Sequence, residues 1–179
     1  MSRERHLVEL VTEAGEPIGS STVEEAHRAP GQMHRAFSVL LVDGAGRLLL
    51  QRRSAAKTRF PLRWGNSCCG HPAPGQPVTD AATQRLAEEL GLDPVPLEEI
   101  GVHVYHAEDP ATGRAEREYD HVLLGRVPSD VALRLDPDEV AEVAWVDPDD
   151  LRTQLRTRPQ DYAPWLAGVT GQLPVPRTP

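Results

Sequence analysis

Aromatic residues, sulfur-containing residues and positive charge are all scarce in this chain of 179 residues. Phe, Trp and Tyr make up 4% of it, and 19 Lys and Arg stand against 27 Asp and Glu, which gives a formal net charge of −8. The deficit of cations excludes a general nucleic-acid binder, because no surplus of Lys and Arg is available to displace counterions from phosphates. It leaves room for a small anionic substrate, for which a few local cations suffice.

Long apolar runs and a disulfide framework are also absent. No stretch reaches the roughly 20 apolar residues that span a bilayer, and the N-terminal MSRERH has no apolar signal core. We therefore expect a cytoplasmic protein without membrane insertion. The two cysteines, Cys68 and Cys69, are neighbours, and a bond between them would be strained. We expect reduced thiols, one of them with a chemical role.

The length fits one domain with its own core. Seventeen prolines and fourteen glycines favour short elements joined by defined turns. Apolar periodicity predicts strands at residues 6–11, 37–42, 47–51, 100–107, 117–127 and 142–146, and helices at residues 79–90, 149–156 and 161–168. This mixture predicts an α/β (α+β) sandwich in a single domain covering residues 1–179, with its core at about residues 6–168 and a Pro-rich tail at residues 169–179.

Two local signals in this pattern are specific. The second and third predicted strands flank the sequence DGAG, which is typical of a β-hairpin turn. In the first predicted helix, Ala81 and Ala82 recur at helical spacing with two leucines. We expect Thr79 or Asp80 to cap the start of this helix and Gly91 to end it.

Two short patterns place reactive side chains close together. Cys69 lies two residues before His71 in a segment with Gly and Pro, which suits a fixed loop that presents both to one site. A small buried cysteine beside a loop histidine explains the same pattern equally well. Glu116 and Glu118 lie two apart on a predicted strand and therefore point to one face. They either hold a cation or a proton between them or form the solvated face of an edge strand.

Two further histidines, His27 and His34, lie in a polar, loop-like stretch. Taken singly, such histidines are usually surface residues. Together with His71, Glu116 and Glu118 they make three imidazoles and two carboxylates. That set suits a six-coordinate divalent ion such as Mn²⁺ or Mg²⁺, with Zn²⁺ as an alternative.

Residues 70–92 resemble the Nudix box, a metal-binding motif of diphosphate hydrolases. The matching positions are Gly70, Leu86, Glu88, Glu89, Gly91 and Leu92. Gln76 replaces the first glutamate of the box, and Gln84 and Arg85 stand where arginine and glutamate are expected. These differences affect the residues that load the metals of a hydrolase. The resemblance therefore implies the scaffold and not the hydrolysis.

Several motifs follow one another in a fixed order along about residues 6–168. They are His27-x6-His34-x-Ala-Phe-Ser, Leu49-Leu-Gln-Arg-Arg53, Trp64-x-Asn-x-Cys-Cys-Gly-His-Pro72, Glu88-Glu-Leu-Gly91, Glu116-x-Glu-Tyr119 and Pro164-Trp165. On these motifs the chain resembles the type 1 isopentenyl-diphosphate isomerases. The resemblance implies a Nudix-like fold, with a mixed β-sheet packed between helices. It also implies an enzyme that interconverts isopentenyl diphosphate and dimethylallyl diphosphate through a tertiary carbocation.

The same resemblance implies a role for each site residue. It assigns proton transfer to Cys69 and Glu118, a supporting hydrogen bond to Tyr105, and stabilisation of the cation to Trp165. One divalent ion (Mn²⁺, Mg²⁺ or Zn²⁺) is expected on His27, His34, His71, Glu116 and Glu118. A second Mg²⁺ is expected to enter with the substrate on Glu89 and Cys69. The expected diphosphate contacts are Arg53, Lys57 and Arg85.

One departure from the family pattern keeps alternatives open. Family members commonly carry a lysine where this chain has Val23, and this chain has additional arginines at Arg59 and Arg63. Either these arginines compensate, or the protein is a related proton-initiated cyclase or isomerase acting on another isoprenoid. A Nudix diphosphatase is disfavoured by Gln76 and Arg85. We expect a monomer or weak dimer whose partner is a small isoprenoid diphosphate.

Overall fold

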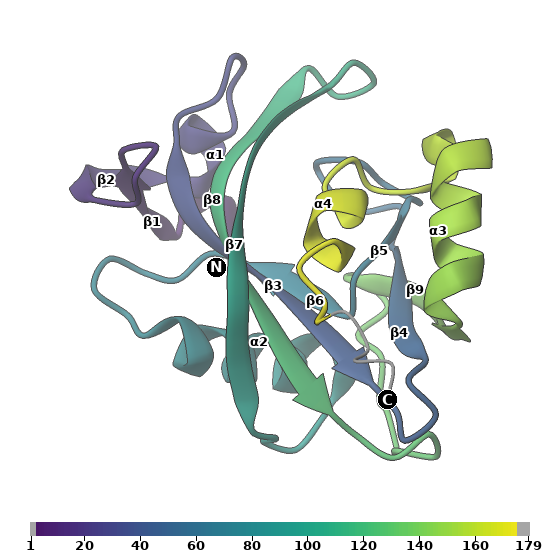
Figure 1. The fold of residues 1–179 in the computed structure, drawn as a ribbon. Coiled ribbons are helices and arrows are strands. Elements are labelled where there is room, and N and C mark those ends of the chain that lie inside the picture. The colour runs from purple at the N-terminus through teal and green to yellow at the C-terminus, as the bar shows by residue number, and fades with distance from the viewer. Residues whose placement is uncertain (1–2, 175–179) are drawn as a thin grey trace.

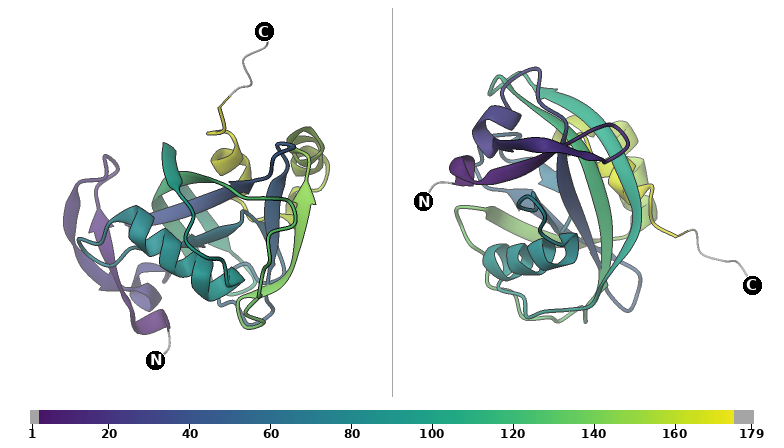
Figure 2. Two further views of the ribbon diagram at one scale, coloured as in Figure 1. Left: turned by 90° about the horizontal axis from the view of Figure 1, so that it is seen from below. Right: turned by 90° about the vertical axis from the view of Figure 1, so that its left-hand side faces the viewer.

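A mixed β-sheet with helices on both sides makes up the fold (Figures 1 and 2). The computed structural model describes residues 3–174. The strands are β1 (Leu7–Val11), β2 (Pro17–Thr22), β3 (His34–Val42), β4 (Leu48–Arg53), β5 (Trp64–Gly65), β6 (Cys68–Gly70), β7 (Leu97–Asp109), β8 (Arg114–Arg126) and β9 (Val140–Val146). The helices are α1 (Val23–Ala26), α2 (Val78–Leu90), α3 (Pro148–Thr157) and α4 (Leu166–Thr170), with 3-10 turns η1 (Arg3–Arg5) and η2 (Pro159–Asp161). The expected sandwich is confirmed, and β2, β5 and β6 were not expected.

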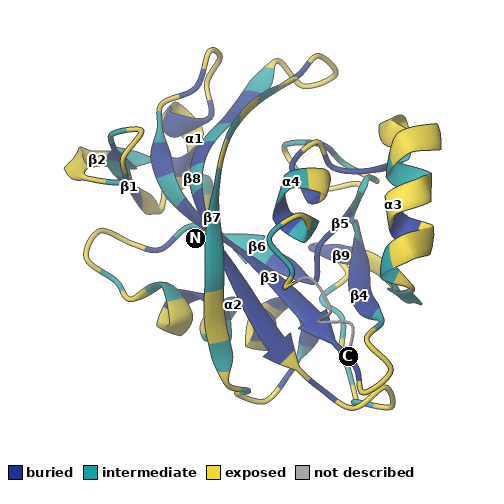
Figure 3. Cartoon of the chain, in the orientation of Figure 1, coloured by how far each residue is buried: buried dark blue, intermediate teal, exposed yellow. Residues whose placement is uncertain are grey.

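Strand β3 lies at the centre of the molecule and is buried on both faces (Figure 3). Its residues Phe37, Val39 and Leu41 pack in the cluster that includes α2, whereas Leu40 and Val42 pack in the cluster of α3 and α4. Successive side chains of a strand point to opposite faces, so a strand between two cores must be apolar at nearly every position. This explains the apolar run from Ala36 to Val42, which only Ser38 interrupts.

The expected hairpin forms its turn but not its ladder. Asp43 holds the turn by accepting from the backbone N–H groups of Ala45 and Arg47, each at 2.9 Å. Val42 and Leu48 are the paired residues of β3 and β4, and beyond them the strands diverge. Strand β4 then pairs with β9 and β5, and β3 pairs with β6 and β8. The space so opened lets β6 bring the two cysteines against β3.

The first predicted helix, α2, starts differently from expectation. Pro77 precedes it, and neither Thr79 nor Asp80 caps it, because the helix begins at Val78. Its end is as predicted, since Gly91 adopts a left-handed conformation with φ of 61°. None of the helices within residues 3–174 is long and apolar enough to cross a membrane.

The last predicted helix, at residues 161–168, is wrong in position. Pro164 lacks a backbone N–H and disfavours helical geometry at the residue before it. Ala163 instead donates its N–H to the carbonyl of Trp64 at 2.7 Å, and α4 begins only after Trp165. The core also continues past residue 168, since Val169 is fully buried. Residues 175–179 of the expected tail lie outside the described residues.

Candidate metal centre and active site

Four separate segments bring the candidate ligands together. Parallel pairing of β3 with β8 sets His34 directly opposite Glu118, and Glu116 lies two residues earlier on the same face of β8. His27 follows α1, whose start is capped by the hydroxyl of Thr22, and His71 follows β6. The polar loop expected around the first two histidines is therefore bounded by a helix end and a strand start.

The five ligand side chains form one compact, buried cluster. One ligand atom from each of His27, His34, His71, Glu116 and Glu118 lies within 4.8 Å of all the others. The three imidazole centroids are 4.6, 4.9 and 4.8 Å apart. Both glutamates are buried, so the solvated-strand interpretation of this pair is wrong. The set provides the nitrogen and oxygen donors of a divalent transition-metal site.

The cluster has buried polar atoms without partners, as a metal site would. His27 and His34 each place Nδ1 at 2.7 Å from a backbone carbonyl, of Val23 and Gln32 respectively. Carbonyls only accept, so each Nδ1 carries a hydrogen, and in the neutral imidazole each Nε2 directs its lone pair into the cluster. Both Nε2 atoms and Oε2 of Glu116 are buried with no hydrogen-bond partner. Such atoms cost free energy unless a cation satisfies them, so the residues fit a metal ion.

The electrostatics of the cluster also call for positive charge. Burial opposes a charged His27, but the neighbouring Glu116 outweighs it and raises the pKa of His27 to about 9. Burial lowers the pKa of His71 to about 4, so this imidazole is neutral, as a ligand must be. Burial opposes ionisation of Glu118 too, yet the close nitrogens of His27, His34 and His71, of which only His71 is hydrogen-bonded to it, at 2.8 Å, hold its pKa well below the usual range. A proton or a metal ion is needed between the carboxylates.

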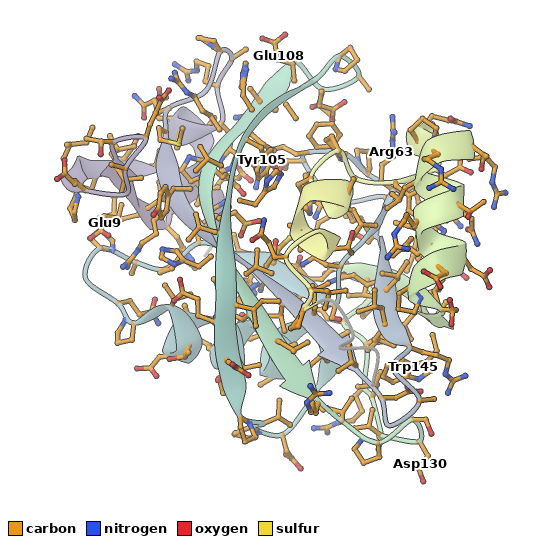
Figure 4. The ribbon with its side chains drawn as sticks, in the orientation of Figure 1. Glu9, Arg63, Tyr105, Glu108, Asp130 and Trp145 are labelled. Carbon is orange, nitrogen blue, oxygen red and sulfur yellow. The ribbon has the colours of Figure 1, made fainter. Side chains whose placement is uncertain are left out.

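Glu118 also contacts the tyrosine that was expected to support it. Its second oxygen accepts a hydrogen bond of 2.7 Å from the hydroxyl of Tyr105 on β7, labelled in Figure 4. Tyr105 lies 6.0 Å, centroid to centroid, from the ring of Trp165, whose Nε1 donates to Asn66. Burial raises the pKa of the Cys69 thiol to about 11, so the thiol is protonated at neutral pH.

One cavity of about 250 Å³ brings these groups together. The predicted site residues that line it are Arg53, Lys57, Cys69, His71, Arg85, Tyr105, Glu116, Glu118 and Trp165. His27 and His34 are fully buried, and Glu89 nearly so; none of the three lines this cavity. The cavity thus has a metal end, at the five-residue cluster, and a cationic end, at Lys57 and Arg85.

The cationic end contains a carboxylate that the sequence did not reveal. Glu139 bonds to Nζ of Lys57, and its Oε2 lies 3.3 Å from Nη2 of Arg85. Arg85 also bonds to Glu89, whose other oxygen accepts from Gln51 at 2.9 Å. Glu139 stands in the acidic sequence DPDEV, which reads as a solvated loop. Its burial, with 8% exposed, distinguishes it from Asp136 and Asp138, which are not buried.

Val23 lines the cavity where the family pattern has a lysine. Of the two additional arginines, Arg59 lines this cavity as well, with its side chain 11% exposed. Arg63 lies elsewhere, in a second pocket beside α3, and its Nη1 is 3.4 Å from the carbonyl of Tyr162. Among these two arginines, only Arg59 can therefore compensate for the missing lysine.

The arrangement of the sheet defines a Nudix-fold protein. The Nudix domain family matches residues 32–167 of the chain. Among solved structures, DR0079 from Deinococcus radiodurans has a TM-score of 0.75 at 20% identity, covering 93% of this chain and 98% of that one. A MutT NUDIX hydrolase from Burkholderia pseudomallei has a TM-score of 0.61 at 24% identity, covering 80% of this chain and 99% of that one. These likenesses concern the fold alone.

Curated relatives narrow the class to one family. The isopentenyl-diphosphate Delta-isomerase of Nocardia farcinica is 58% identical over 90% of this chain and 91% of its own length. The enzyme of that name from Streptomyces coelicolor is 48% identical over 91% of this chain and 81% of its own length. That from Halorhodospira halophila is 41% identical over 95% of both. The chain belongs to the isopentenyl-diphosphate Delta-isomerase family.

Proposed function

We propose that this protein interconverts isopentenyl diphosphate and dimethylallyl diphosphate. The observation that carries the proposal is the position of Glu118. This one carboxylate belongs to the histidine cluster, accepts a hydrogen bond from Tyr105, and lines the same cavity as Cys69. A hydrolase does not need a thiol and a carboxylate in one cavity, whereas a double-bond shift needs two proton-transfer groups.

The reaction requires one proton to be delivered and another removed. A proton adds to the terminal carbon of the alkene, and the π electrons form the new C–H bond, which leaves a tertiary cation. A proton then leaves the adjacent methylene, and the electrons of that C–H bond become the new double bond. Cys69 and Glu118 are the cavity-lining groups proposed to give and take these protons, and they exchange roles in the reverse direction.

The metal cluster and the aromatic wall support these steps. A divalent ion (Mn²⁺, Mg²⁺ or Zn²⁺) on the three histidines and two glutamates would stabilise negative charge on Glu118 and help to set its pKa. Tyr105 orients the same carboxylate through its hydroxyl. Trp165 is 3% exposed and lines the cavity, where its ring can face a cation and exclude the water that would trap it as an alcohol.

Arg53, Lys57 and Arg85 are the proposed contacts of the diphosphate, since all three line the cavity. The proposed second Mg²⁺, on Glu89 and Cys69, fits less well than the first. Both oxygens of Glu89 already accept from Arg85 and Gln51, and a thiol is a soft ligand for a hard ion. An ion at Glu89 would have to displace these donors, so we derive no step through it.

The decisive test is incubation of the purified protein with isopentenyl diphosphate in deuterated water, with products identified by mass spectrometry and NMR. We expect dimethylallyl diphosphate with deuterium incorporated into the carbon skeleton. Release of inorganic phosphate would instead indicate a hydrolase. Turnover only of a longer isoprenoid would assign the cavity, with its apolar Val23, to the alternative cyclase or isomerase.

A further inference from the structure

Arg59 connects three parts of the molecule that are far apart in sequence. Its Nε donates to Oε1 of Glu116 at 3.0 Å, and its Nη1 lies 3.2 Å from Oε1 of Glu4 in η1. The hydroxyl of Thr58 accepts from the same Nη1 at 2.9 Å and donates to Glu4 at 3.0 Å. The guanidinium thus lies between the metal cluster and the N-terminal turn, with Glu116 buried and the side chain of Glu4 21% exposed.

The loop that carries Arg59 is held in one conformation. Phe60 and Leu62 both have positive φ, 44° and 61°, which is unfavourable for side chains of this size. Asp109 fixes this backbone by accepting the N–H of Phe60 at 2.8 Å, and the ring of Phe60 packs against Trp165. The carbonyl of Arg59 accepts from Nη2 of Arg53 at 2.8 Å. The surroundings therefore determine where the guanidinium of Arg59 lies.

The hydrogen bond to Arg59 decides how Glu116 can ligate. It occupies Oε1, and leaves Oε2 as the unpartnered oxygen, 2.8 Å from Nε2 of His27. A carboxylate held in this way offers one oxygen to a metal, in one direction. The positive charge of Arg59 would repel a metal ion, but Glu4 lies on its other side and offsets that charge. The effect of Arg59 on metal affinity is then dominated by its orientation of Glu116, and not by repulsion between its charge and the metal ion.

We propose that Arg59, kept in place and neutralised by Glu4, is a positioning residue that orients Glu116 toward the metal. The proposal rests on the proposed metal centre and adds to it a residue that contacts a ligand without touching the ion. Partners of this kind typically contribute about 10- to 100-fold to metal affinity.

The test is titration of the chelator-stripped, full-length protein with Mn²⁺ alone, in the absence of substrate, followed by electron paramagnetic resonance of the free ion. We expect Arg59→Ala to weaken Mn²⁺ binding about 10- to 100-fold. Arg59→Lys should weaken it about tenfold, because an ammonium cannot reproduce the planar fork between Glu116 and Glu4. Arg63→Ala is the matched control, from the same loop, and should bind Mn²⁺ as the wild type does.

Glu4→Ala separates positioning through Arg59 from a general effect of charge. It should weaken Mn²⁺ binding in the wild type but not in the Arg59→Ala protein, because Glu4 acts through Arg59. A purely electrostatic effect would persist in both backgrounds. If Arg59→Ala does not fold, Arg59→Lys takes its place as the second background for Glu4→Ala.

Two other outcomes separate failure of the inference about Arg59 from failure of the proposed metal centre. If the wild type binds Mn²⁺ and the folded Arg59 variants bind it equally well, the inference is wrong while the metal centre stands. If the Arg59 variants bind Mn²⁺ as the wild type does but have a raised KM for isopentenyl diphosphate, Arg59 contacts the substrate instead. If the wild type binds none of Mn²⁺, Mg²⁺ and Zn²⁺, the metal centre itself is wrong and the inference with it.

Discussion

The two ends of the cavity satisfy their charges in opposite ways. At the metal end, Nε2 of His27 and His34 and Oε2 of Glu116 are buried without hydrogen-bond partners. At the cationic end, Lys57 and Arg85 are already paired with carboxylates of this chain. The metal end is incomplete without a cation, whereas the cationic end is complete without an anion.

This difference shows how the two ends would recognise their ligands. A divalent ion at the metal end would find one donor atom from each of the five residues already within 4.8 Å of the others. A diphosphate at the cationic end must replace Glu139 and Glu89 as the partner of Lys57 and Arg85. Metal binding is therefore expected to be preorganised, and substrate binding to be an exchange of ion pairs.

The largest effect is expected at Cys69, which lines the cavity and belongs to neither end. Cys69→Ala should lower the rate of isomerisation by about 10²- to 10⁴-fold, because it removes one proton-transfer group where no water can replace it. It should leave Mn²⁺ content unchanged, since the thiol belongs to neither end. Rate measurements with isopentenyl diphosphate, together with metal analysis, check both statements.

Cys68 supplies the matched control for this prediction. It is fully buried in the core cluster of α2 and does not line the cavity. Cys68→Ala should keep most of the activity. An inactive Cys68→Ala beside an active Cys69→Ala would mean that the two thiols have been assigned the wrong way round.

The next largest effect concerns the incomplete metal end. Mn²⁺ at 100 times its dissociation constant should stabilise the wild type by about 2.7 kcal/mol, because it binds the folded state only. His34→Ala removes a ligand and should abolish that increase, which differential scanning calorimetry measures as a shift in Tm. Equal shifts in both proteins would show that the ion binds outside the cluster.

At the cationic end, removal of a positive charge and removal of a negative charge should change the KM in opposite directions. Lys57→Met should raise the KM for isopentenyl diphosphate about 10-fold or more, because it removes a charged hydrogen bond to phosphate. Glu139→Gln should lower the KM about threefold, because it removes an anion that competes with the substrate. If Glu139→Gln raises the KM as Lys57→Met does, Glu139 holds the cations in place and the exchange of ion pairs is wrong.

The smallest effect is expected at Glu88, which pairs with Arg85 at 2.9 Å. Burial opposes its ionisation, but hydrogen bonds from Arg3, Arg85 and Gln84 lower its pKa to about 2. The folded-state pKa lies below the unfolded value, so this stabilisation is present above about pH 4.5 and disappears as the pH falls toward 2. The side chain is 35% exposed, so Glu88→Gln should cost about 0.5 kcal/mol at pH 7.

Urea unfolding of the wild type and of Glu88→Gln at pH 7 and near pH 3 measures this effect. The difference in the free energy of unfolding should shrink at the lower pH. A difference in the free energy of unfolding that does not change with pH would show that the ion pairs of Glu88 contribute nothing to stability.

Much of the fold could be read from the chain because its signals are local. The apolar run of β3, the DGAG turn and the helix that ends at Gly91 each depend on residues close in sequence. The predicted helix at residues 161–168 failed because Ala163 bonds to Trp64, about one hundred residues away. The hairpin ladder failed for the same kind of reason, since β9 and β6 compete for the edges of β4 and β3.

For the site, the order of residues along the chain specifies which side chains are available and which near neighbours share a face. The two-residue period of a strand is enough to place Glu116 and Glu118 together, and a resemblance in motifs identified the other candidates. The parallel pairing of β3 with β8, which sets His34 opposite Glu118, is seen only in the folded chain. The fold also reveals Glu139 and Arg59 as partners of site residues. The physical reason is that strand pairing and buried ion pairs depend on which distant segments exclude water together, and no local pattern specifies that.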